Sequence, residues 1–164
     1  MGRGRYAISS SLRKRQDTCA ELCITLQSAK SEATAQRWGR KRDLVISADS
    51  RTLPIPEQAL ALISEELVDN ACKFSAPSTP IVVNASTDVA CWKISVSDVG
   101  CGMSPAQVRS VGAFRQFWSG GQRPQGLGLG LVLVQTLTRL HSGEFQIEAN
   151  AHGGTCATVM IPAE

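Results

Sequence analysis

The segment "EELVDNACKFS", residues 65–75, constrains the fold of this chain more than any other stretch, because two stripes of different character run along it. Its apolar residues recur three and four apart, as on one face of a helix: Leu67, Ala71 and Phe74. A polar stripe with the same spacing lies beside them: Glu66, Asn70 and Lys73. This periodicity predicts a helix with one buried face, which begins near Pro56, a residue suited to a first helical turn. The aligned acid, amide and cation need a separate explanation.

Strand and helix patterns alternate along the rest of the chain. Short runs rich in β-branched residues predict strands, and apolar residues at helical spacing predict helices. In chain order, the predicted elements are a strand at 43–48, the helix at 57–74, a hairpin of strands at 81–86 and 91–97, a short helix at 105–112, a helix at 131–141, and two closing strands at 144–150 and 155–162. This order predicts an α+β fold built as a two-layer sandwich, with helices packed on one sheet.

The first part of the chain differs in charge from the rest. Residues 1–43 carry a net charge of +6, and residues 44–164 carry a net charge of −3. One long helix is predicted from about Thr18 to about Gly39, because apolar and small residues recur at helical spacing: Leu22, Leu26, Ala29 and Ala33. We therefore divide the chain into a basic, partly helical extension at 1–43 and a domain at 44–164. A solvated helix surface explains the basic charge, so no nucleic-acid partner is expected.

Composition excludes several classes of protein. Hydrophobic residues make up 43% of the 164 residues, which is too many for a disordered protein. No apolar run approaches the ~20 residues that a membrane span needs. Six cysteines occur without a clear metal-binding pattern, since the one close pair, Cys19 and Cys23, has no histidine nearby. A reduced, cytoplasmic setting is expected, which includes the cytoplasmic part of a membrane sensor.

Glycines cluster at 100–102, 126–130 and 153–154. A Walker phosphate loop is excluded because Leu127 stands where that motif needs lysine, and a dinucleotide fingerprint fits poorly because a loop rather than a strand precedes the second cluster. Glycines that open a helix let backbone N–H groups approach an anion, and the helix dipole adds to the attraction. The helix after Gly128 is therefore predicted to bind an anion, and a flexible loop that caps this helix is the alternative.

Asp98 follows a strand in phase with its buried positions. In "KISVSD", Ile94, Val96 and Asp98 alternate onto one face, the apolar one. A carboxylate among core residues stays ionised only if a strong donor pairs with it, and the exocyclic amine of a nucleobase is such a donor. An aspartate that starts the turn before "GCG" explains the same residue without a ligand. The pattern leaves both interpretations open.

Taken together, these motifs resemble those of the GHKL ATPases, which have the Bergerat fold, and most closely the catalytic ATP-binding domain of sensor histidine kinases. Four boxes occur in the family's order: "EELVDNACKFS" resembles the N box, "DVGCG" the G1 box, "FRQF" the F box and "GLGLGL" the G2 box. The closing "GGTCATVMIP" is similar to the family's last strand. The resemblance covers residues 44–164, and its specificity lies in the order of the boxes rather than in any single one.

The resemblance implies a role for each residue of the polar stripe. The stripe would face bound ATP, with Asn70 as a ligand of Mg²⁺, Lys73 paired with phosphate, and Glu66 as general base or polarising acid near the γ-phosphate. Asp98 would accept a hydrogen bond from the adenine amino group, and Thr155 would support it through a hydroxyl or a water. The other residues that the resemblance places at the nucleotide are Gly100, Gly102, Phe114, Phe117, Arg123, Gly126, Leu127, Gly128, Leu129 and Gly130.

Two further features follow from comparison with the family pattern. Residues 103–125 would form a mobile lid over ATP, anchored by its two phenylalanines, and Arg123 would either reach the γ-phosphate or stay solvated. Leu127 departs from the pattern, because threonine or serine often lies between the first G2 glycines. A phosphoacceptor histidine motif is also missing, since His141 lies in "RLHSGEF", which is similar to a helix-to-strand junction of the family.

The resemblance therefore implies an ATP-dependent protein-histidine kinase domain, which transfers the γ-phosphate of ATP to a histidine on a separate domain. The implied partners are a histidine-bearing dimerisation domain, in cis or in trans, and a response regulator, with a homodimer as one expected assembly of the full-length protein. Two alternatives remain open. One is a stand-alone serine kinase of the anti-sigma type, which shares these boxes, and the other is a GHKL ATPase or nucleotide-sensor module.

Overall fold

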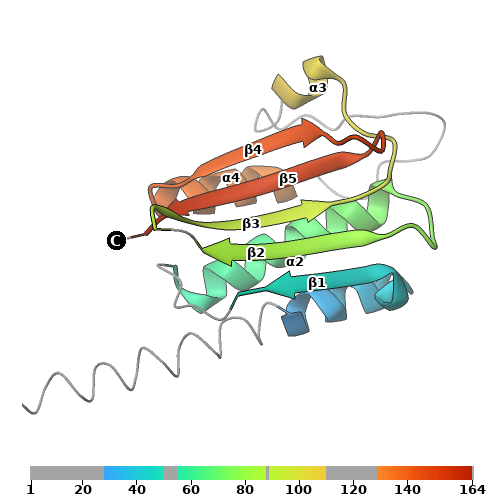
Figure 1. Cartoon of the computed structure of the whole chain (residues 1–164), viewed down its shortest axis with the longest axis horizontal. Helices are drawn as coiled ribbons and strands as arrows, with labels where there is room; N and C mark the ends of the chain where they lie inside the picture. Colours follow the sequence, from blue (N-terminus) through green and yellow to red (C-terminus); the bar gives the residue numbers. More distant parts are fainter. Residues whose placement is uncertain (1–27, 50–54, 88, 110–128, 164) are drawn as a thin grey trace, which may run out of the picture.

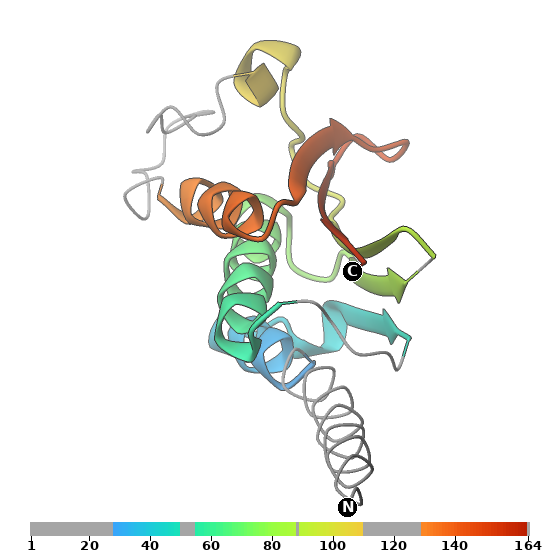
Figure 2. The same cartoon turned by 90° about the vertical axis from the view of Figure 1, so that its left-hand side faces the viewer.

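The computed structural model describes residues 28–49, 55–87, 89–109 and 129–163 of the chain. Within these ranges, one five-stranded sheet forms a layer, and two long helices lie behind it in Figure 1. Figure 2 shows the two layers from the side, with both helices on the same face of the sheet. This arrangement confirms the predicted α+β two-layer sandwich.

The sheet has the strand order β1-β2-β3-β5-β4. β1 (Leu44–Ala48) pairs in parallel with β2 (Ile81–Thr87). The other neighbours are antiparallel: β2 with β3 (Cys91–Ser97), β3 with β5 (Thr155–Pro162), and β5 with β4 (Glu144–Ala149). All five predicted strands are therefore present, and the parallel pair is joined through the helix that carries the polar stripe.

The helical elements occur in the predicted order. They are the 3-10 turn η1 (Lys41–Asp43) and the helices α2 (Glu57–Phe74), α3 (Pro105–Arg109) and α4 (Gly130–Leu140). α2 begins directly after Pro56 and ends at Phe74, as predicted. α2 and α4 pack side by side and form the helical layer.

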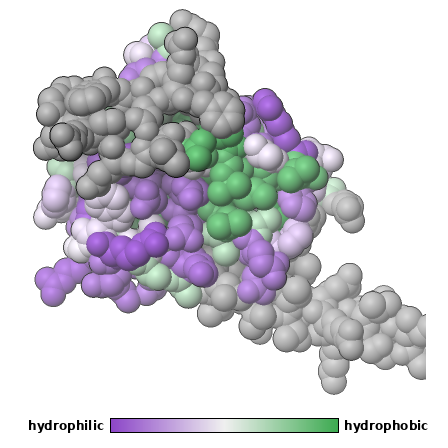
Figure 3. Space-filling view, turned by 180° about the vertical axis from the view of Figure 1, so that it is seen from behind, coloured by the Kyte–Doolittle hydropathy of each residue, from purple (hydrophilic) through white to green (hydrophobic). Residues whose placement is uncertain are grey.

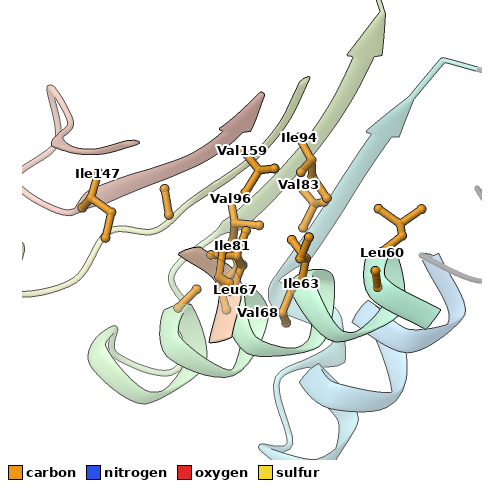
Figure 4. Packing of buried hydrophobic residues seen from close by; sticks show 14 of the residues in the cluster. Leu60, Ile63, Leu67, Val68, Ile81, Val83, Ile94, Val96, Ile147 and Val159 are labelled. Carbon is orange, nitrogen blue, oxygen red and sulfur yellow. The ribbon is translucent and has the colours of Figure 1, made fainter. Parts of the chain in front are cut away.

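The core lies between the sheet and the helices, where side chains from both layers meet (Figure 4). Alternate residues of the central strands face it, as expected for a sheet with one covered face. The largest fully buried side chains include Trp92, Leu60, Ile63, Leu67, Ile81 and Ile94. Phe74, predicted on the apolar stripe, is instead 39% exposed, because it is the last residue of α2 and projects beyond the core.

Hydrophobic surface also lies on the outer side of the helical layer, where Figure 3 shows a patch of apolar residues. Large exposed apolar side chains of this layer are Leu62 on α2, Leu129 directly before α4, and Leu140 at the end of α4. No helix in the described ranges is long and apolar enough to cross a membrane.

The described part of the N-terminal extension is a helix at residues 28–37, which is followed by Gly39 in the left-handed conformation (φ 69°). The helix thus ends where predicted, but a different face of it is buried. Ala29 and Ala33 of the predicted stripe are exposed, whereas Ser31, Thr34 and Ala35 are buried. The apolar period failed to identify this face because the helix packs through small and hydroxyl side chains, which such a period does not detect.

Two side-chain contacts join the end of this helix to α2. Arg37 Nη2 lies 2.8 Å from Glu65 Oε1, and Trp38 Nε1 donates to Asp69 Oδ1 at 2.8 Å. Both acidic partners directly precede residues of the polar stripe in the sequence. The extension therefore contacts α2 next to the polar stripe. The division of the chain at residue 43 stays a prediction.

Arg40 closes the junction between the extension and the domain. Its guanidinium is buried and donates to Asp43 Oδ2 at 2.8 Å and to Thr79 O at 2.8 Å. It also donates to Cys72 O at 3.2 Å and Ser75 O at 3.1 Å, at the C-terminal end of α2. Because a buried guanidinium costs free energy unless its N–H groups are paired, these bonds hold the extension, α2 and the loop before β2 in one geometry.

Trp38→Phe is expected to lower the free energy of unfolding by about 1 kcal/mol, because phenylalanine keeps an aromatic ring but has no N–H to donate to Asp69. Urea denaturation followed by circular dichroism measures the change. Val89→Ala, at a fully exposed side chain, is the control and should leave the midpoint unchanged. An unchanged midpoint for Trp38→Phe would show that the indole N–H does not stabilise the packing of the extension.

Candidate nucleotide-binding site

The polar stripe predicted on residues 65–75 lies on α2 in the structure. Glu66, Asn70 and Lys73 are each half-buried, so their side chains are accessible at the edge of the helix rather than inside the core. Glu66 and Lys73 are seven positions apart, which corresponds to about 10 Å along the helix axis. The stripe can therefore contact a ligand at several points along one side of the helix.

The C-terminal end of the stripe is bonded to the loop that follows β3. Cys101 N donates to Phe74 O at 3.2 Å, and an isolated β-bridge pairs Ser75 with Gly100. A Cβ on Gly100 would overlap Phe74 O, so glycine is required at this approach. Lys73 also lies at this end, with Nζ 5.1 Å from the centroid of the Phe74 ring. The predicted N and G1 boxes therefore meet in space.

Asp98 lies at this junction, where β3 ends, and only 7% of it is exposed. Its Oδ1 accepts hydrogen bonds from Gly100 N at 2.8 Å and from Thr155 N at 3.4 Å. No described residue donates to Oδ2. Burial raises the pKa of the Asp98 carboxyl, and the two backbone N–H groups oppose this effect. One oxygen is thus held by the fold, and the other is left for a ligand.

Thr155 supports Asp98 in a different way from the prediction. The contact comes from its backbone N–H, and Asp98 N in turn donates to Thr155 O at 3.0 Å. A backbone group serves here because β3 and β5 are paired neighbours, so the ends of the two strands lie side by side. Asp98 therefore starts the turn through Oδ1, while Oδ2 receives no hydrogen bond from a described residue.

The other end of the stripe lies beside the start of α4. A Cβ on Gly130 would overlap Glu66 Oε2, so the carboxylate occupies the space that the glycine leaves. Leu129, the N-cap residue of α4, makes no side-chain capping hydrogen bond, so no side chain of this residue satisfies the first N–H groups of the helix. The first N–H groups of a helix, together with the helix dipole, attract anions.

Glu66 has the electrostatic environment of a proton acceptor. Burial raises the pKa of its carboxyl, and the nearby charges of Asp69 and Glu65 raise it further, while Arg37 opposes them. A carboxylate with a raised pKa is more basic than an exposed glutamate and holds a proton at higher pH. Glu66 also lies where the start of α4 would attract the phosphates of a ligand. Its raised pKa and this position together make it the candidate general base of the site.

Asn70 lies between the two ends of the stripe. No described residue hydrogen-bonds to its carboxamide, which leaves the oxygen available to a metal ion. The described residues contain no cluster of three or more His, Cys, Asp or Glu side chains that could hold a metal by themselves. This pattern fits Mg²⁺, which proteins usually bind through one or two side chains while phosphate oxygens and waters complete the shell.

Asn150 was not predicted as a site residue, yet its side chain makes hydrogen bonds around Asp98. It lies directly after β4, in the turn that leads through Gly153 and Gly154 into β5. The one signal in the sequence is an asparagine between a strand and a glycine pair, which is typical of a turn and carries no information about a partner 52 residues away.

Six predicted site residues lie outside the described residues, and their roles stay predictions: Phe114, Phe117, Arg123, Gly126, Leu127 and Gly128. Gly102 is described and adopts a φ of 65°, a conformation that favours glycine. A Cβ there would approach Gly153 O to 2.5 Å, so Gly102 also packs against the turn between β4 and β5. The described site residues therefore converge from α2, the end of β3, the start of β5 and the start of α4.

Known proteins match this chain over most of its length. DivJ, a histidine protein kinase of Caulobacter vibrioides, is 36% identical over 121 residues, which make up 73% of this chain and 19% of DivJ. The cell-division control histidine kinase PdhS of Brucella suis is 26% identical over 160 residues, with 85% of this chain and 15% of PdhS covered. The chain thus spans about a fifth or less of the length of these relatives.

Solved structures share the fold. The mycobacterial sensor histidine kinase MprB matches with a TM-score of 0.67 at 21% identity, over 82% of this chain and 94% of that chain. ShkA, solved full-length in complex with AMPPNP, matches with a TM-score of 0.63 at 22% identity, over 84% of this chain and 29% of that chain. The profile of the histidine kinase-, DNA gyrase B-, and HSP90-like ATPases matches residues 56–164, and the chain belongs to this GHKL family.

Proposed function

We propose that this chain is the ATP-binding catalytic domain of a sensor histidine kinase, which binds ATP with Mg²⁺ and transfers the γ-phosphate to a histidine on a separate domain. The observation that carries the proposal is the polar stripe of α2. It runs from Asp98, a buried carboxylate whose Oδ2 has no donor among the described residues, to the start of α4, where Leu129 provides no side-chain cap. An adenine nucleotide has the matching order of groups, with an amine at one end and anionic oxygens at the other.

The base end of the nucleotide would bind at Asp98. Its free Oδ2 would accept a hydrogen bond from the adenine amino group, while Gly100 N and Thr155 N hold Oδ1. The phosphates would then extend along the stripe past Lys73 and Asn70 toward the start of α4. Mg²⁺, held by Asn70 and phosphate oxygens, would neutralise part of the phosphate charge.

Glu66 would act at the terminal phosphate. As the imidazole nitrogen of the acceptor histidine bonds to the γ-phosphorus, the bond to the bridging oxygen breaks and ADP leaves with the electron pair. Glu66 would accept the proton that the imidazole loses, and its raised pKa suits it to this task. The acceptor is expected on another domain, because this chain has no phosphoacceptor motif around either of its histidines, His141 after α4 and His152 in the turn between β4 and β5.

The names of the relatives support the partners of this reaction. DivJ and PdhS are named as histidine kinases, and the chain spans only a small part of each. We infer that a histidine-bearing dimerisation domain, in cis or in trans, receives the phosphate, that a response regulator takes it on, and that the full-length kinase acts as a homodimer in the cytoplasm.

The test of this function is incubation with γ-labelled ATP and Mg²⁺, with and without a separately produced histidine-bearing dimerisation domain of a sensor histidine kinase. We expect acid-labile, base-stable label on the added domain and none on this chain. Label on His141 would contradict the assignment of the acceptor to a separate domain. Acid-stable label on a serine of a partner would favour the anti-sigma type of kinase instead.

Asn70→Ala is expected to remove the Mg²⁺-dependent part of the ATP affinity, because alanine offers no oxygen to the metal. The Kd for ADP in the presence of a chelator should stay close to that of the unmodified chain. Isothermal titration with ATP and ADP, each with Mg²⁺ and with chelator, gives all four constants. Equal losses in all four titrations would mean that the substitution disturbs the pocket as a whole.

A further inference from the structure

Asn150 uses both ends of its side-chain amide. Its Nδ2 donates to Asp98 O at 2.6 Å, to Ser97 Oγ at 3.0 Å and to Thr155 O at 3.3 Å. Its Oδ1 accepts from His152 N at 3.0 Å and from Gly154 N at 3.1 Å. The donating end therefore contacts the end of β3 and the start of β5, and the accepting end holds the turn that connects β4 to β5.

These bonds hold the backbone at Asp98 and at the strand end beside it. Asn150 fixes the carbonyl of Asp98 and the backbone at Thr155, whose N–H donates to Asp98 Oδ1. Gly154 packs so closely here that a Cβ on it would overlap Asp98 O. Figure 1 shows the β4–β5 turn beside the segment that leaves β3, as this packing requires. The backbone at Asp98 is thus held by a residue that lies between β4 and β5.

The chemistry of this position selects an amide. The carbonyl oxygens of Asp98 and Thr155 accept only, and the N–H groups of His152 and Gly154 donate only, so one side chain must both donate and accept. Aspartate at residue 150 would place oxygen against two carbonyl oxygens, and alanine would leave both sets of groups without this partner.

We propose that Asn150 is a positioning residue for adenine recognition, which acts by holding Asp98 with its free oxygen directed at the base. The inference rests on the proposed function, because it takes Asp98 as the group that reads the adenine amine. A side chain that only stabilised the turn would affect all nucleotides alike. A positioning residue affects only those that present an amine to Asp98.

The test compares ADP with IDP, which differs in carrying an oxygen in place of the adenine amine. In Asn150→Asp and Asn150→Ala, the Kd for ADP is expected to rise about tenfold, as for one lost hydrogen bond, while the Kd for IDP changes little. The preference for ADP over IDP therefore falls. His152→Ala is the matched control in the same turn, because only its backbone contacts Asn150, and it should keep the preference.

Asp98→Asn distinguishes a failure of adenine recognition by Asp98 from a failure of the positioning role of Asn150. If Asp98→Asn leaves the preference for ADP over IDP unchanged, Asp98 does not recognise adenine, and the positioning role of Asn150 is overturned as well. If it abolishes the preference while both Asn150 variants keep it, only the positioning role is overturned. Equal losses of ADP and IDP affinity in both variants, or the absence of a cooperative thermal transition in both, would make Asn150 a residue of the fold alone and would also overturn the proposal.

Discussion

Glu66→Gln is expected to slow phosphotransfer to the acceptor histidine by about 100- to 10,000-fold, the usual contribution of a general base. Glutamine keeps the size of the side chain, so it fits the space beside Gly130, but its amide does not accept the proton of the imidazole. The Kd for ATP should change little, because the proposed role is in the reaction and not in binding. Labelled ATP, together with a histidine-bearing dimerisation domain, measures the rate.

The pH dependence of the same reaction offers a second check on Glu66. Burial and the charges of Asp69 and Glu65 raise the pKa of Glu66, so the rate should fall on acidification at a higher pH than an exposed glutamate would cause. Glu65→Gln is the matched control: it keeps the base and removes one of the charges that raise its pKa. This variant should shift the acid limb to lower pH. A wild-type rate in Glu66→Gln, at any pH, would remove Glu66 from the mechanism.

Asp98→Asn is expected to raise the Kd for ATP and ADP by about 30- to 150-fold, which corresponds to about 2–3 kcal/mol for a charge-assisted hydrogen bond in a closed site. Asparagine Oδ1 still accepts from Gly100 N and Thr155 N, but its Nδ2 then meets the adenine amine, and both groups are donors. The loss should be similar with Mg²⁺ and with chelator, because Asp98 is proposed to contact the base and not the metal. Isothermal titration measures it, and unchanged affinity would refute adenine recognition at Asp98.

The same substitution should not lower the stability of the nucleotide-free domain at neutral pH. Burial raises the pKa of Asp98 in the folded state, so the folded chain binds more protons than the unfolded chain between the two pKa values. The stability linked to this carboxyl is therefore greatest below the unfolded pKa and is lost as the pH rises through the folded pKa. Asp98→Asn avoids that loss, so its melting temperature at pH 7 should equal or exceed that of the unmodified chain. A clearly lower value would mean that the Asp98 charge stabilises the fold.

The sequence by itself predicted the elements and their order, because both depend on short-range patterns. The strands at β2, β3 and β5 and the helix α2 follow from hydrophobic period and from Pro56, and their order restricts the fold to a two-layer sandwich. The predicted stripe of Glu66, Asn70 and Lys73 is likewise a local property of one helix. Its interpretation as a nucleotide site came from the resemblance to the family and not from the period.

Contacts between distant segments were decided only by the tertiary structure. Which face of the helix at 28–37 is buried depends on small and hydroxyl residues, whose burial follows from the neighbouring α2 and not from their own spacing. Asn150 likewise acquires its partners because the order β3-β5-β4 brings the β4–β5 turn beside Asp98. A turn residue and a residue that holds Asp98 look the same in sequence, because the hydrogen bonds that distinguish them cross 52 residues of chain.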